Sequence, residues 1–365
     1  MSRALAPDPR PGSHVRRPSA SPVQLALSDP EWRSFVDRHP GALPYHLPAW
    51  AELVADCYHL PAFVVAVRDS TGAISAGIPV IRTRVPLRPS RLVALPFTDF
   101  CPPLAAGDAD EARLVAALDV ARRAAGAQRV EVRGPLPQAA VLGDAGYRHV
   151  LHLDGNPAAV FARFHRSQVQ RNVRKAEATE LTIRIGTSER DLLDDFYVLH
   201  LATRRRLGVP IQPHRFFRLL RERILRPGIG WVVSVESAGR PIAAALFMAT
   251  RSTVVYKYGA SDADAWRLRP NHLLFWNAIR AACEAGHQQF DFGRTDADAD
   301  GLRTFKQSWG TEEQPLVYHV IGDTGPRPSS PAHPGAARRL MSRLIRQSPA
   351  WVCRWSGELL YRFVA

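Results

Sequence analysis

Lysine is nearly absent from this chain of 365 residues. Of its 48 basic residues only Lys175, Lys257 and Lys306 are lysines, and all the others are arginines. Arginine replaces lysine wherever charge alone matters, so a lysine that remains points to a need for a compact point charge or a titratable amine. The three lysines are therefore the first candidates for functional side chains.

Long apolar runs and paired cysteines are also missing. No run of 18 apolar residues occurs, which excludes a transmembrane helix. Residues 1–21 are rich in proline, arginine and serine without an apolar stretch, so we expect a disordered start and no secretory signal. Four scattered cysteines without a CxxC pair predict buried, reduced thiols and a cytoplasmic protein. We expect no metal site and no bound cofactor.

Positive charge is present in excess and is unevenly spread. The formal net charge is +14. Residues 156–322 carry 24 basic and 17 acidic residues, and residues 323–365 carry seven arginines against two carboxylates. A basic surface attracts phosphates of nucleic acid, nucleotide or lipid, although a solvated arginine-rich surface explains the same count.

The chain also contains an internal repeat. The segment 64–78, VVAVRDSTGAISAGI, aligns without gaps on 232–246, VVSVESAGRPIAAAL, and each reads as two strands around a turn. The segments 124–134 and 284–294 both read as a helix end, a glycine and a strand. We expect five segments: a disordered start (1–21), two similar domains (22–155 and 156–322), a linker (323–337) and basic amphipathic helices (338–365).

The element order supports an α/β (α+β) fold with mixed sheets flanked by helices. The second domain predicts a helix at 157–179, a strand at 181–185, helices at 189–206 and 214–225, and strands at 231–236, 241–249 and 253–259. A helix at 271–285, a strand at 288–292, a short helix at 302–309 and a strand at 315–321 complete it. This order is that of the GNAT acyltransferase fold, and the first domain repeats it less clearly, with its last strand at 147–153.

Six stretches in this order resemble the FemABX family and its BioF2-like acyltransferase relatives. They are FHRSQVQRNVRKAE, FYVLHLATRRRLGVP, VVYKYGAS, RPNHLLFW, FDFGRT and GLRTFKQSWG. The resemblance covers about residues 22–322 and implies two tandem GNAT-like domains. It also implies transfer of an amino acid from aminoacyl-tRNA to an amine of a peptidoglycan precursor, whereas other relatives act on polysaccharides or natural products.

The place of the CoA loop bears on the acyl donor. GNAT domains that bind CoA hold its pyrophosphate with a Q/R-x-x-G-x-G/A loop at a helix N-terminus. Here Arg267–His272 reads RLRPNH, which lacks both glycines, and Pro270 removes one N–H donor. We expect Asn271 to cap the following helix. A donor other than CoA is favoured.

Three residues are candidates for the chemistry. The resemblance implies that Lys306 stabilises charge at the reacting carbonyl and holds the acyl-tRNA end. Asp99 is a candidate to accept or orient the proton of the attacking amine, or else it caps a turn. Tyr256 is the third candidate. Because side chains alternate along a strand, either Tyr256 and Tyr258 or Lys257 reach the cleft, and packing of both tyrosines is the alternative.

Other residues are candidates for binding. The resemblance implies that Arg206 holds a precursor diphosphate, although the lysine expected beside it in the first domain has no counterpart here. Asp291 and Arg294 lie beside the cleft of this fold, or form an internal ion pair. For substrate binding we therefore name Arg206, Lys257, Tyr258, Arg294 and Asp291. For tRNA phosphates we name Arg171, Arg174 and Lys175 on one cationic helix, with a solvated face as the alternative.

The tail suggests a membrane surface. In AARRLMSRLIRQ the apolar residues Leu340, Met341, Leu344 and Ile345 share one arc and the arginines take the other, and Trp351 and Trp355 follow. A basic amphipathic helix with tryptophans is typical of an anionic lipid surface. A helix packed on the body, or on a second copy, is the alternative.

The resemblance and the residues together predict a cytoplasmic N-acyltransferase. Peripheral binding to the inner face of the cell membrane is compatible with this prediction. The predicted donor is aminoacyl-tRNA, the predicted acceptor is a small or lipid-linked amine, and no DNA is expected. The first alternative is an acyltransferase that uses acyl-CoA or an acyl carrier. The second is a non-catalytic module that binds membrane or RNA.

Overall fold

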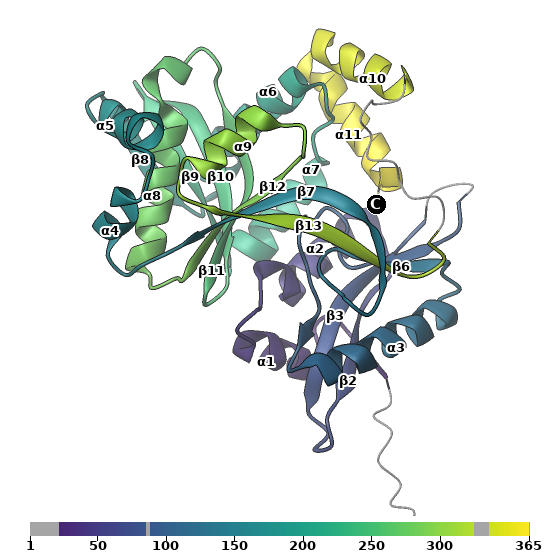
Figure 1. Ribbon diagram of the computed structural model, residues 1–365. Helices are drawn as coiled ribbons and strands as arrows, with labels where there is room; N and C mark the ends of the chain where they lie inside the picture. The colour runs from purple at the N-terminus through teal and green to yellow at the C-terminus, as the bar shows by residue number, and fades with distance from the viewer. Residues whose placement is uncertain (1–21, 85–87, 325–335, 365) are drawn as a thin grey trace, which may run out of the picture.

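The computed structural model describes residues 22–84, 88–324 and 336–364, and their thirteen strands form one mixed sheet with helices packed against it (Figure 1). We call residues 22–155 the first half and residues 156–322 the second half. The first half contains β1 (Val23–Leu25), α1 (Pro30–Arg38), α2 (Pro48–Tyr58), β2 (Ala62–Arg68), β3 (Ile74–Thr83), β4 (Arg91–Val93), β5 (Leu104–Ala105), α3 (Asp108–Ala124), β6 (Arg129–Val132) and β7 (Ala140–His152).

The second half and the tail continue the chain with further helices and strands. They contain α4 (Pro157–Ala162), α5 (Arg171–Glu177), β8 (Leu181–Gly186), α6 (Val198–Leu207), α7 (His214–Leu220), β9 (Gly230–Ser237), β10 (Arg240–Ala249), β11 (Thr253–Ser261), α8 (Pro270–Glu284), β12 (Gln289–Thr295), α9 (Asp300–Gln307), β13 (Glu312–Gly322), α10 (Ala336–Gln347) and α11 (Ala350–Val364). Arg166–Gln170, Arg190–Tyr197 and Arg221–Leu225 are π-helical turns next to α5, α6 and α7.

The internal repeat is visible in the sheet. Strands β2, β3 and β4 are antiparallel and β4 runs parallel to β6, and β9, β10, β11 and β12 repeat this pattern. The C-cap residue is an alanine in both α3 (Ala125) and α8 (Ala285). A left-handed glycine follows each, Gly126 (φ 58°) and Gly286 (φ 77°). A glycine takes this conformation without steric cost, so it ends both helices at the same point before the next strand.

The gapless alignment of the repeat is wrong by one residue after the turn. Val65 lies opposite Ile78, and the equivalent Val233 lies opposite Ala245. Between the equivalent pairs Arg68–Ile74 and Glu236–Pro241 the first hairpin contains one residue more, and each hairpin has an irregularity beside its turn. Ile78 and Ala245 are therefore equivalent, whereas the sequence alignment pairs Ile78 with Leu246.

The last strand of each half pairs with the other half. Strand β13 lies between β6 and β7, and β7 lies between β13 and β12. Figure 1 shows both strands crossing the middle of the molecule side by side. The two halves therefore share a continuous sheet through exchanged strands.

Two predicted elements have different bounds. The helix expected at 157–179 is interrupted, because the His165 N–H bonds to the Ser308 carbonyl (2.8 Å) and Phe164 packs on Trp309. The strand expected at 147–153 begins at Ala140, because its first residues pair with β13, far away in sequence. Gly143 and Gly146, both at positive φ, interrupt the sequence pattern from which a strand is predicted.

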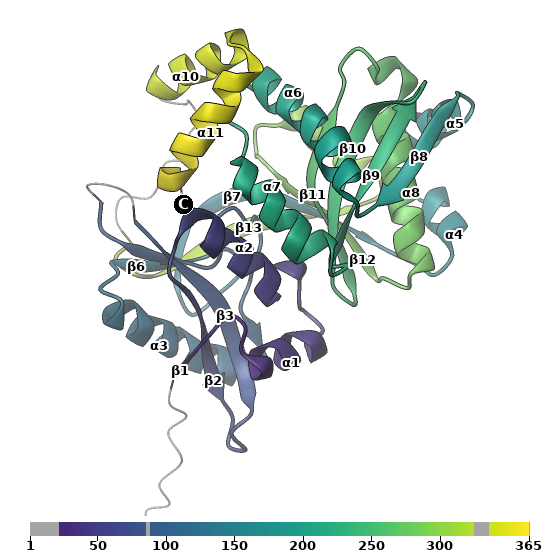
Figure 2. The ribbon, with the colours of Figure 1, turned by 180° about the vertical axis from the view of Figure 1, so that it is seen from behind.

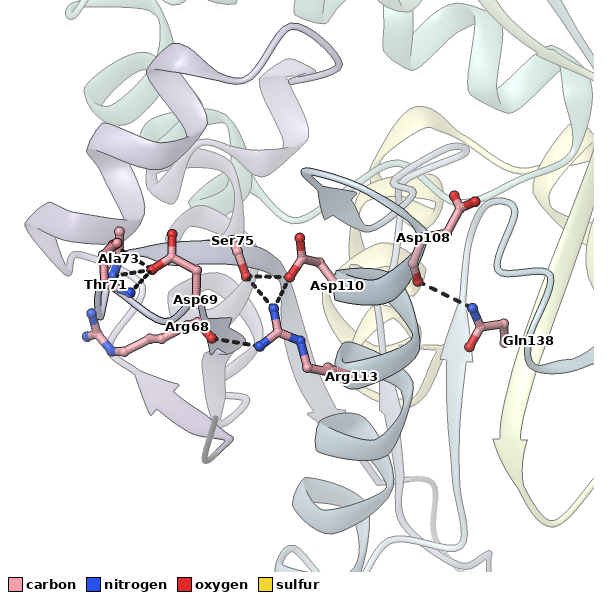
Figure 3. A network of polar contacts seen from close by, with 9 residues as sticks. All are labelled: Arg68, Asp69, Thr71, Ala73, Ser75, Asp108, Asp110, Arg113 and Gln138. Atoms are coloured by element: carbon pink, nitrogen blue, oxygen red, sulfur yellow. Dashed lines mark hydrogen bonds and ion pairs between the residues drawn. The ribbon is translucent and has the colours of Figure 1, made fainter. Parts of the chain in front are cut away.

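Polar contacts fix the start of α3 on the β2–β3 hairpin (Figure 3). The Arg113 guanidinium donates to the Arg68 carbonyl (3.0 Å) and to Asp110, and the Ser75 hydroxyl donates to Asp110 (2.9 Å). The first turn of α3 carries Asp108, Asp110 and Glu111. Acidic side chains there complement the helix dipole and occupy the place where an anion would otherwise bind.

The tail helices pack on α6. Both views show α10 and α11 beside this helix (Figures 1 and 2). Ile345, Cys353 and Tyr361 are buried, and the Tyr361 hydroxyl lies between Arg204 (2.9 Å) and the Pro210 carbonyl (3.3 Å). All four cysteines are buried thiols that take part in no disulfide bond, as predicted.

Candidate active site

A cavity of about 410 Å³ opens in the second half, within the size range of small-molecule sites. Strand β11 pairs with β12 only through Thr253–Val255, and the remaining residues of the two strands diverge. Strand β10, α8 and α9 complete its walls. The lining residues are Thr203, Ala244, Ala245, Tyr256, Gly259, Ala260, Ser261, Asn271, Leu274, Phe275, Phe292, Gly301, Leu302, Phe305 and Lys306.

Lys306 contributes the ammonium group of this cavity. Its side chain is 3% exposed, and Nζ donates to the carbonyls of Gly293 (3.0 Å) and Arg294 (2.8 Å). An ammonium has three N–H donors, so one remains for a ligand. Burial lowers the pKa of Lys306 to about 8, against the opposing fields of Asp291 and Asp99. The group is therefore a cation at neutral pH that is close to its titration point.

Helix α9 holds Lys306 in place through its neighbour Arg303. The Arg303 guanidinium makes two hydrogen bonds to Glu313 of β13, 2.7 and 2.6 Å long, and lies 4.0 Å from the centre of the Tyr147 ring of β7. A bidentate pair of this kind fixes orientation as well as distance. The exchanged strands β7 and β13 thus anchor the helix that carries the cavity's ammonium.

Tyr256 lines the same cavity and keeps its proton. Burial raises the pKa of its phenol to about 12. The ring packs on Phe247 and Phe275, and the hydroxyl lies against the backbone of Gly259, where a Cβ would come within 2.1 Å of it. Tyr256 is thus a hydrogen-bond donor whose position requires a glycine three residues later.

The expected alternation of residues 256–258 is wrong. Leu246 and Phe247 are consecutive on β10, but they pair with Tyr258 and Tyr256, so Lys257 is the extra residue of a β-bulge. A bulge places a side chain where regular alternation does not. As a result Tyr256 lines the cavity, whereas Lys257 and Tyr258 are neighbours away from it, with Nζ 5.1 Å from the Tyr258 ring centre.

Lys257 joins the second half to the first. Its Nζ donates to the Phe97 carbonyl (2.6 Å) and lies 5.0 and 4.8 Å from the ring centres of Tyr45 and Trp50. Burial lowers its pKa to about 8, and Asp99 acts against this. Tyr258 packs beside it on His200 and Phe216. These contacts place Lys257 and Tyr258 at the junction of the halves.

Asp99 lies in the loop after β4, on the first-half side of this junction. Its carbonyl accepts the Tyr318 hydroxyl (2.7 Å). Its negative charge raises the pKa values of Lys306 and Lys257, although burial has the larger and opposite effect on both. Asp99 is thus a carboxylate of the first half whose field reaches both buried lysines.

The two candidates from FDFGRT are already engaged with protein groups. The Asp291 carboxylate is buried, accepts the Arg148 guanidinium (2.7 Å) and accepts the Gly293 N–H (2.7 Å). Arg294 pairs with the exposed Asp296, and its carbonyl accepts Lys306. The alternative of an internal ion pair between Asp291 and Arg294 is therefore wrong, because each side chain pairs with a different residue.

Arg206 lies at the edge of the cavity. Its guanidinium is 4.8 Å from the ring centre of Trp266, whose Nε1 donates to the Ser261 hydroxyl (2.9 Å), and Ser261 lines the cavity. Asn271 also donates to Ser261 (3.3 Å), and the predicted cap at this residue is wrong because α8 already begins at Pro270.

The cationic helix α5 lies outside the cavity. Arg171, Arg174 and Lys175 are all exposed, and none of them lines it. The segment before α5 reaches the cavity's helix, because His272 of α8 hydrogen-bonds the backbone of Gln168. The three cations therefore remain a separate surface beside the start of α8.

Two residues of this region were missed from the sequence. Arg148 holds Asp291 and lies 4.4 Å from the centre of the Phe100 ring, but no motif marks it within YRHVLH. Trp266 is half exposed between Arg206 and the cavity, and a tryptophan in the basic stretch before α8 was the available signal. In the part of the chain that the structure describes, no cluster of three His, Cys, Asp or Glu residues can hold a metal ion. None of the described helices combines the length and apolar character that a bilayer span needs.

Comparisons with known proteins agree with this geometry. The family model of the acetyltransferase (GNAT) domain matches residues 163–307. A lipid II:glycine glycyltransferase of Staphylococcus epidermidis is 34% identical over 110 residues, which are 25% of this chain and 26% of that protein. The chain thus covers about a quarter of the length of this curated relative.

Solved structures show the same fold over most of the chain. A crystal structure of FemX superimposes with a TM-score of 0.67 at 18% identity, over 81% of this chain and 96% of that one. L-PGS from Bacillus licheniformis superimposes with a TM-score of 0.54 at 14% identity, over 89% of this chain and 99% of that one. The predicted α/β GNAT-like fold and the resemblance to FemABX proteins are confirmed, and the match over residues 163–307 supports an acyltransferase.

Proposed function

We propose that the protein is a FemABX-like N-acyltransferase that moves an aminoacyl group from tRNA to an amine of a peptidoglycan precursor or a related acceptor. One observation carries the proposal. The buried Lys306 ammonium donates two hydrogen bonds to β12 carbonyls, and its third N–H remains for a ligand in the cavity. Such a preorganised cation is suited to a carbonyl oxygen that becomes negative during acyl transfer.

The chemistry follows from the groups around the cavity. The neutral acceptor amine attacks the ester carbonyl, and the resulting oxyanion is stabilised by Lys306 and by the protonated phenol of Tyr256. The C–N bond forms, the C–O bond to the ribose breaks, and the ribose oxygen leaves with a proton that the amine gives up. Asp99 is proposed to receive or orient that proton, because its field already reaches Lys306.

The donor is proposed from the start of α8. CoA enzymes of this fold use glycine N–H groups at this place, but here Arg269 is left-handed (φ 61°) and Pro270, the first helical residue, has no N–H. A tRNA donor needs a cationic surface instead. We propose that Arg171, Arg174 and Lys175 of α5 hold tRNA phosphates, because α5 is exposed beside α8.

The acceptor is proposed from the relative's name and from Arg206. The matched relative acts on lipid II, which favours a lipid-linked amine acceptor for this chain. Arg206 at the cavity edge is proposed to hold the acceptor's phosphate, without the second cation that the family places in the first domain. A cytoplasmic protein that binds the inner face of the membrane peripherally fits such an acceptor.

Filter binding tests the donor. The protein is incubated separately with charged tRNA, uncharged tRNA and labelled acetyl-CoA. The salt concentration is about 150 mM, at which long-range attraction to phosphate is screened. We expect a preference for charged tRNA that Lys306→Ala weakens and Arg280→Ala, an exposed control on α8, leaves intact. Saturable CoA binding without preference for charged tRNA would favour the acyl-CoA alternative. No transfer activity with any donor, together with full complementation by Lys306→Ala, would favour a non-catalytic module.

A further inference from the structure

The tail helices α10 and α11 have one face packed on the body. Besides the buried Ile345 and Tyr361, the Cys353 thiol lies 3.6 Å from the Val209 carbonyl. Gly357 lies so close to the segment between α6 and α7 that a Cβ would come within 1.8 Å of the Ile211 carbonyl oxygen. The helices are therefore fixed by close packing, and their orientation is set by the body.

The opposite face of the same helices is apolar and open. Among described residues it exposes five large side chains, which we call the tail face: Leu340 (59% exposed), Met341 (36%), Leu344 (55%), Trp351 (65%) and Trp355 (65%). Isolated exposed apolar residues are ordinary, but a concentration of five on two successive helices is typical of an interaction surface.

The charge of these helices indicates what covers the patch. Residues 336–357 contain five arginines and no aspartate or glutamate. Arg339 and Arg343 are exposed next to Leu340 and Leu344 in the sequence, whereas Arg346 and Arg354 are exposed but contact the body at Leu207 and Tyr197. Apolar side chains with tryptophan and a strong excess of cations match an anionic lipid surface, and Glu358 is the single carboxylate in the sequence of these two helices.

The tail face leads to the mouth of the cavity. Arg346 donates to the Leu207 carbonyl (3.3 Å), and Gly208 lies against Ser342, so α10 contacts the end of α6. Leu207 is itself exposed, and the preceding Arg206 lies on the half-exposed Trp266 beside the cavity. Leu207 and Trp266 thus add two exposed apolar side chains between the tail and the cavity residue Ser261, to which Trp266 donates.

We propose that the tail face binds an anionic bilayer surface and so places the cavity mouth at the membrane, where a lipid-linked acceptor can enter. The bilayer contact stands on the tail alone, and the delivery of the acceptor rests on the proposed function. In this arrangement the acceptor's lipid stays in the bilayer while its head group passes Arg206.

Vesicle sedimentation of the full-length protein tests the contact. Vesicles of phosphatidylcholine alone are compared with vesicles in which about one lipid in three is the anionic phosphatidylglycerol, at low and physiological salt. We expect salt-sensitive binding only to the anionic vesicles. Trp351→Ala/Trp355→Ala should reduce it about tenfold or more, and Arg339→Gln/Arg343→Gln about 25-fold, at about fivefold for each cation near the surface.

A matched control uses apolar residues exposed elsewhere. Val120→Ala/Ile185→Ala changes exposed side chains on α3 and β8, and should leave vesicle binding unchanged. Thermal unfolding of each variant checks that the fold is intact. Equal binding to both vesicle types, or loss of binding in the control alone, contradicts the proposal. So does light scattering that shows a dimer which Trp351→Ala/Trp355→Ala converts to a monomer, because a second copy would then cover the face.

A transfer assay separates this inference from the proposed function. Trp351→Ala/Trp355→Ala should slow transfer to a lipid-linked acceptor in vesicles but not to a water-soluble amine acceptor. Transfer to the soluble acceptor without any vesicle binding would remove the tail inference alone. Vesicle binding without transfer from any aminoacyl-tRNA would remove the proposed function alone.

Discussion

In the first half Ile78 occupies the place on β3 that Ala245 occupies on β10 in the second half, since each lies opposite an equivalent valine. Ile78 is fully buried among the core residues under α3, whereas Ala245 lines the cavity under α8. At this position of the repeated unit the side chain belongs to the core in one copy and lines a cavity in the other. The difference in side-chain size at this position contributes to the space for a ligand.

The N-termini of the equivalent helices α3 and α8 also differ between the two halves. The first turn of α3 carries three acidic residues, and Asp110 among them is bound by Ser75 and Arg113 (Figure 3). The first turn of α8 carries none, and Arg269 precedes it. An anionic group is repelled at the first start and tolerated at the second. The comparison supports our proposal that the second half binds the ligand and the first half supports it.

The largest expected effect tests the two buried lysines against each other. Lys306→Met should lower kcat about 10²–10³-fold, the usual loss for one donor to an oxyanion. Lys257→Met should chiefly weaken the contact with Phe97 and lower thermal stability. Steady-state kinetics and thermal unfolding of both variants check this. A greater loss of turnover in Lys257→Met would mean that the wrong lysine has been assigned to the oxyanion.

Exchanging the equivalent residues tests the comparison itself. Ala245→Ile should fill part of the cavity and raise the donor KM about 100-fold, as a bulky side chain in a binding pocket costs a few kcal/mol. Ile78→Ala should leave kcat unchanged below the melting range but cost about 2–5 kcal/mol of unfolding free energy. Denaturant unfolding and kinetics measure both. Equal loss of turnover in the two variants at low temperature would contradict the division of roles.

The pH profile offers a smaller effect. Because burial lowers the pKa of Lys306 to about 8, its cation is present below pH 8 and is lost as the pH rises further. We expect initial rates to fall about tenfold for each pH unit above this point. The first-half His46, whose pKa burial lowers to about 4, stays neutral over this range. Lys306→Arg should move the falling limb to higher pH, and an unchanged limb in this variant would assign it to another group.

The smallest effect concerns the acceptor. Arg206→Gln should raise the acceptor KM about tenfold with kcat unchanged, because a charged hydrogen bond to phosphate contributes about 1.5–3 kcal/mol. Arg123→Gln removes an exposed arginine of the first half and should change neither constant. Kinetics with varied acceptor concentration distinguish the two. A fall in kcat with KM unchanged would place Arg206 in the chemical step instead.

Local signals in the sequence predict much of the fold. The Ala-Gly pairs that end α3 and α8 predict both helix ends, because a left-handed glycine needs no tertiary partner. The bulge at Lys257 escapes such reasoning, since the register of β10 against β11 decides it. The ion pair of Arg148 with Asp291 escapes for a similar reason: it joins β7 to β12, which are 143 residues apart at these positions.

The exchange of β7 and β13 has a consequence for synthesis on the ribosome. Strand β6 of the first half lacks its neighbour β13 until residues 312–322 have been synthesised. Until then β6 presents an unpaired edge, the kind of surface that aggregates. Contacts that span nearly 200 residues also close slowly. The two halves therefore finish folding together, and a gene split between them would yield fragments that are soluble only when produced in the same cell.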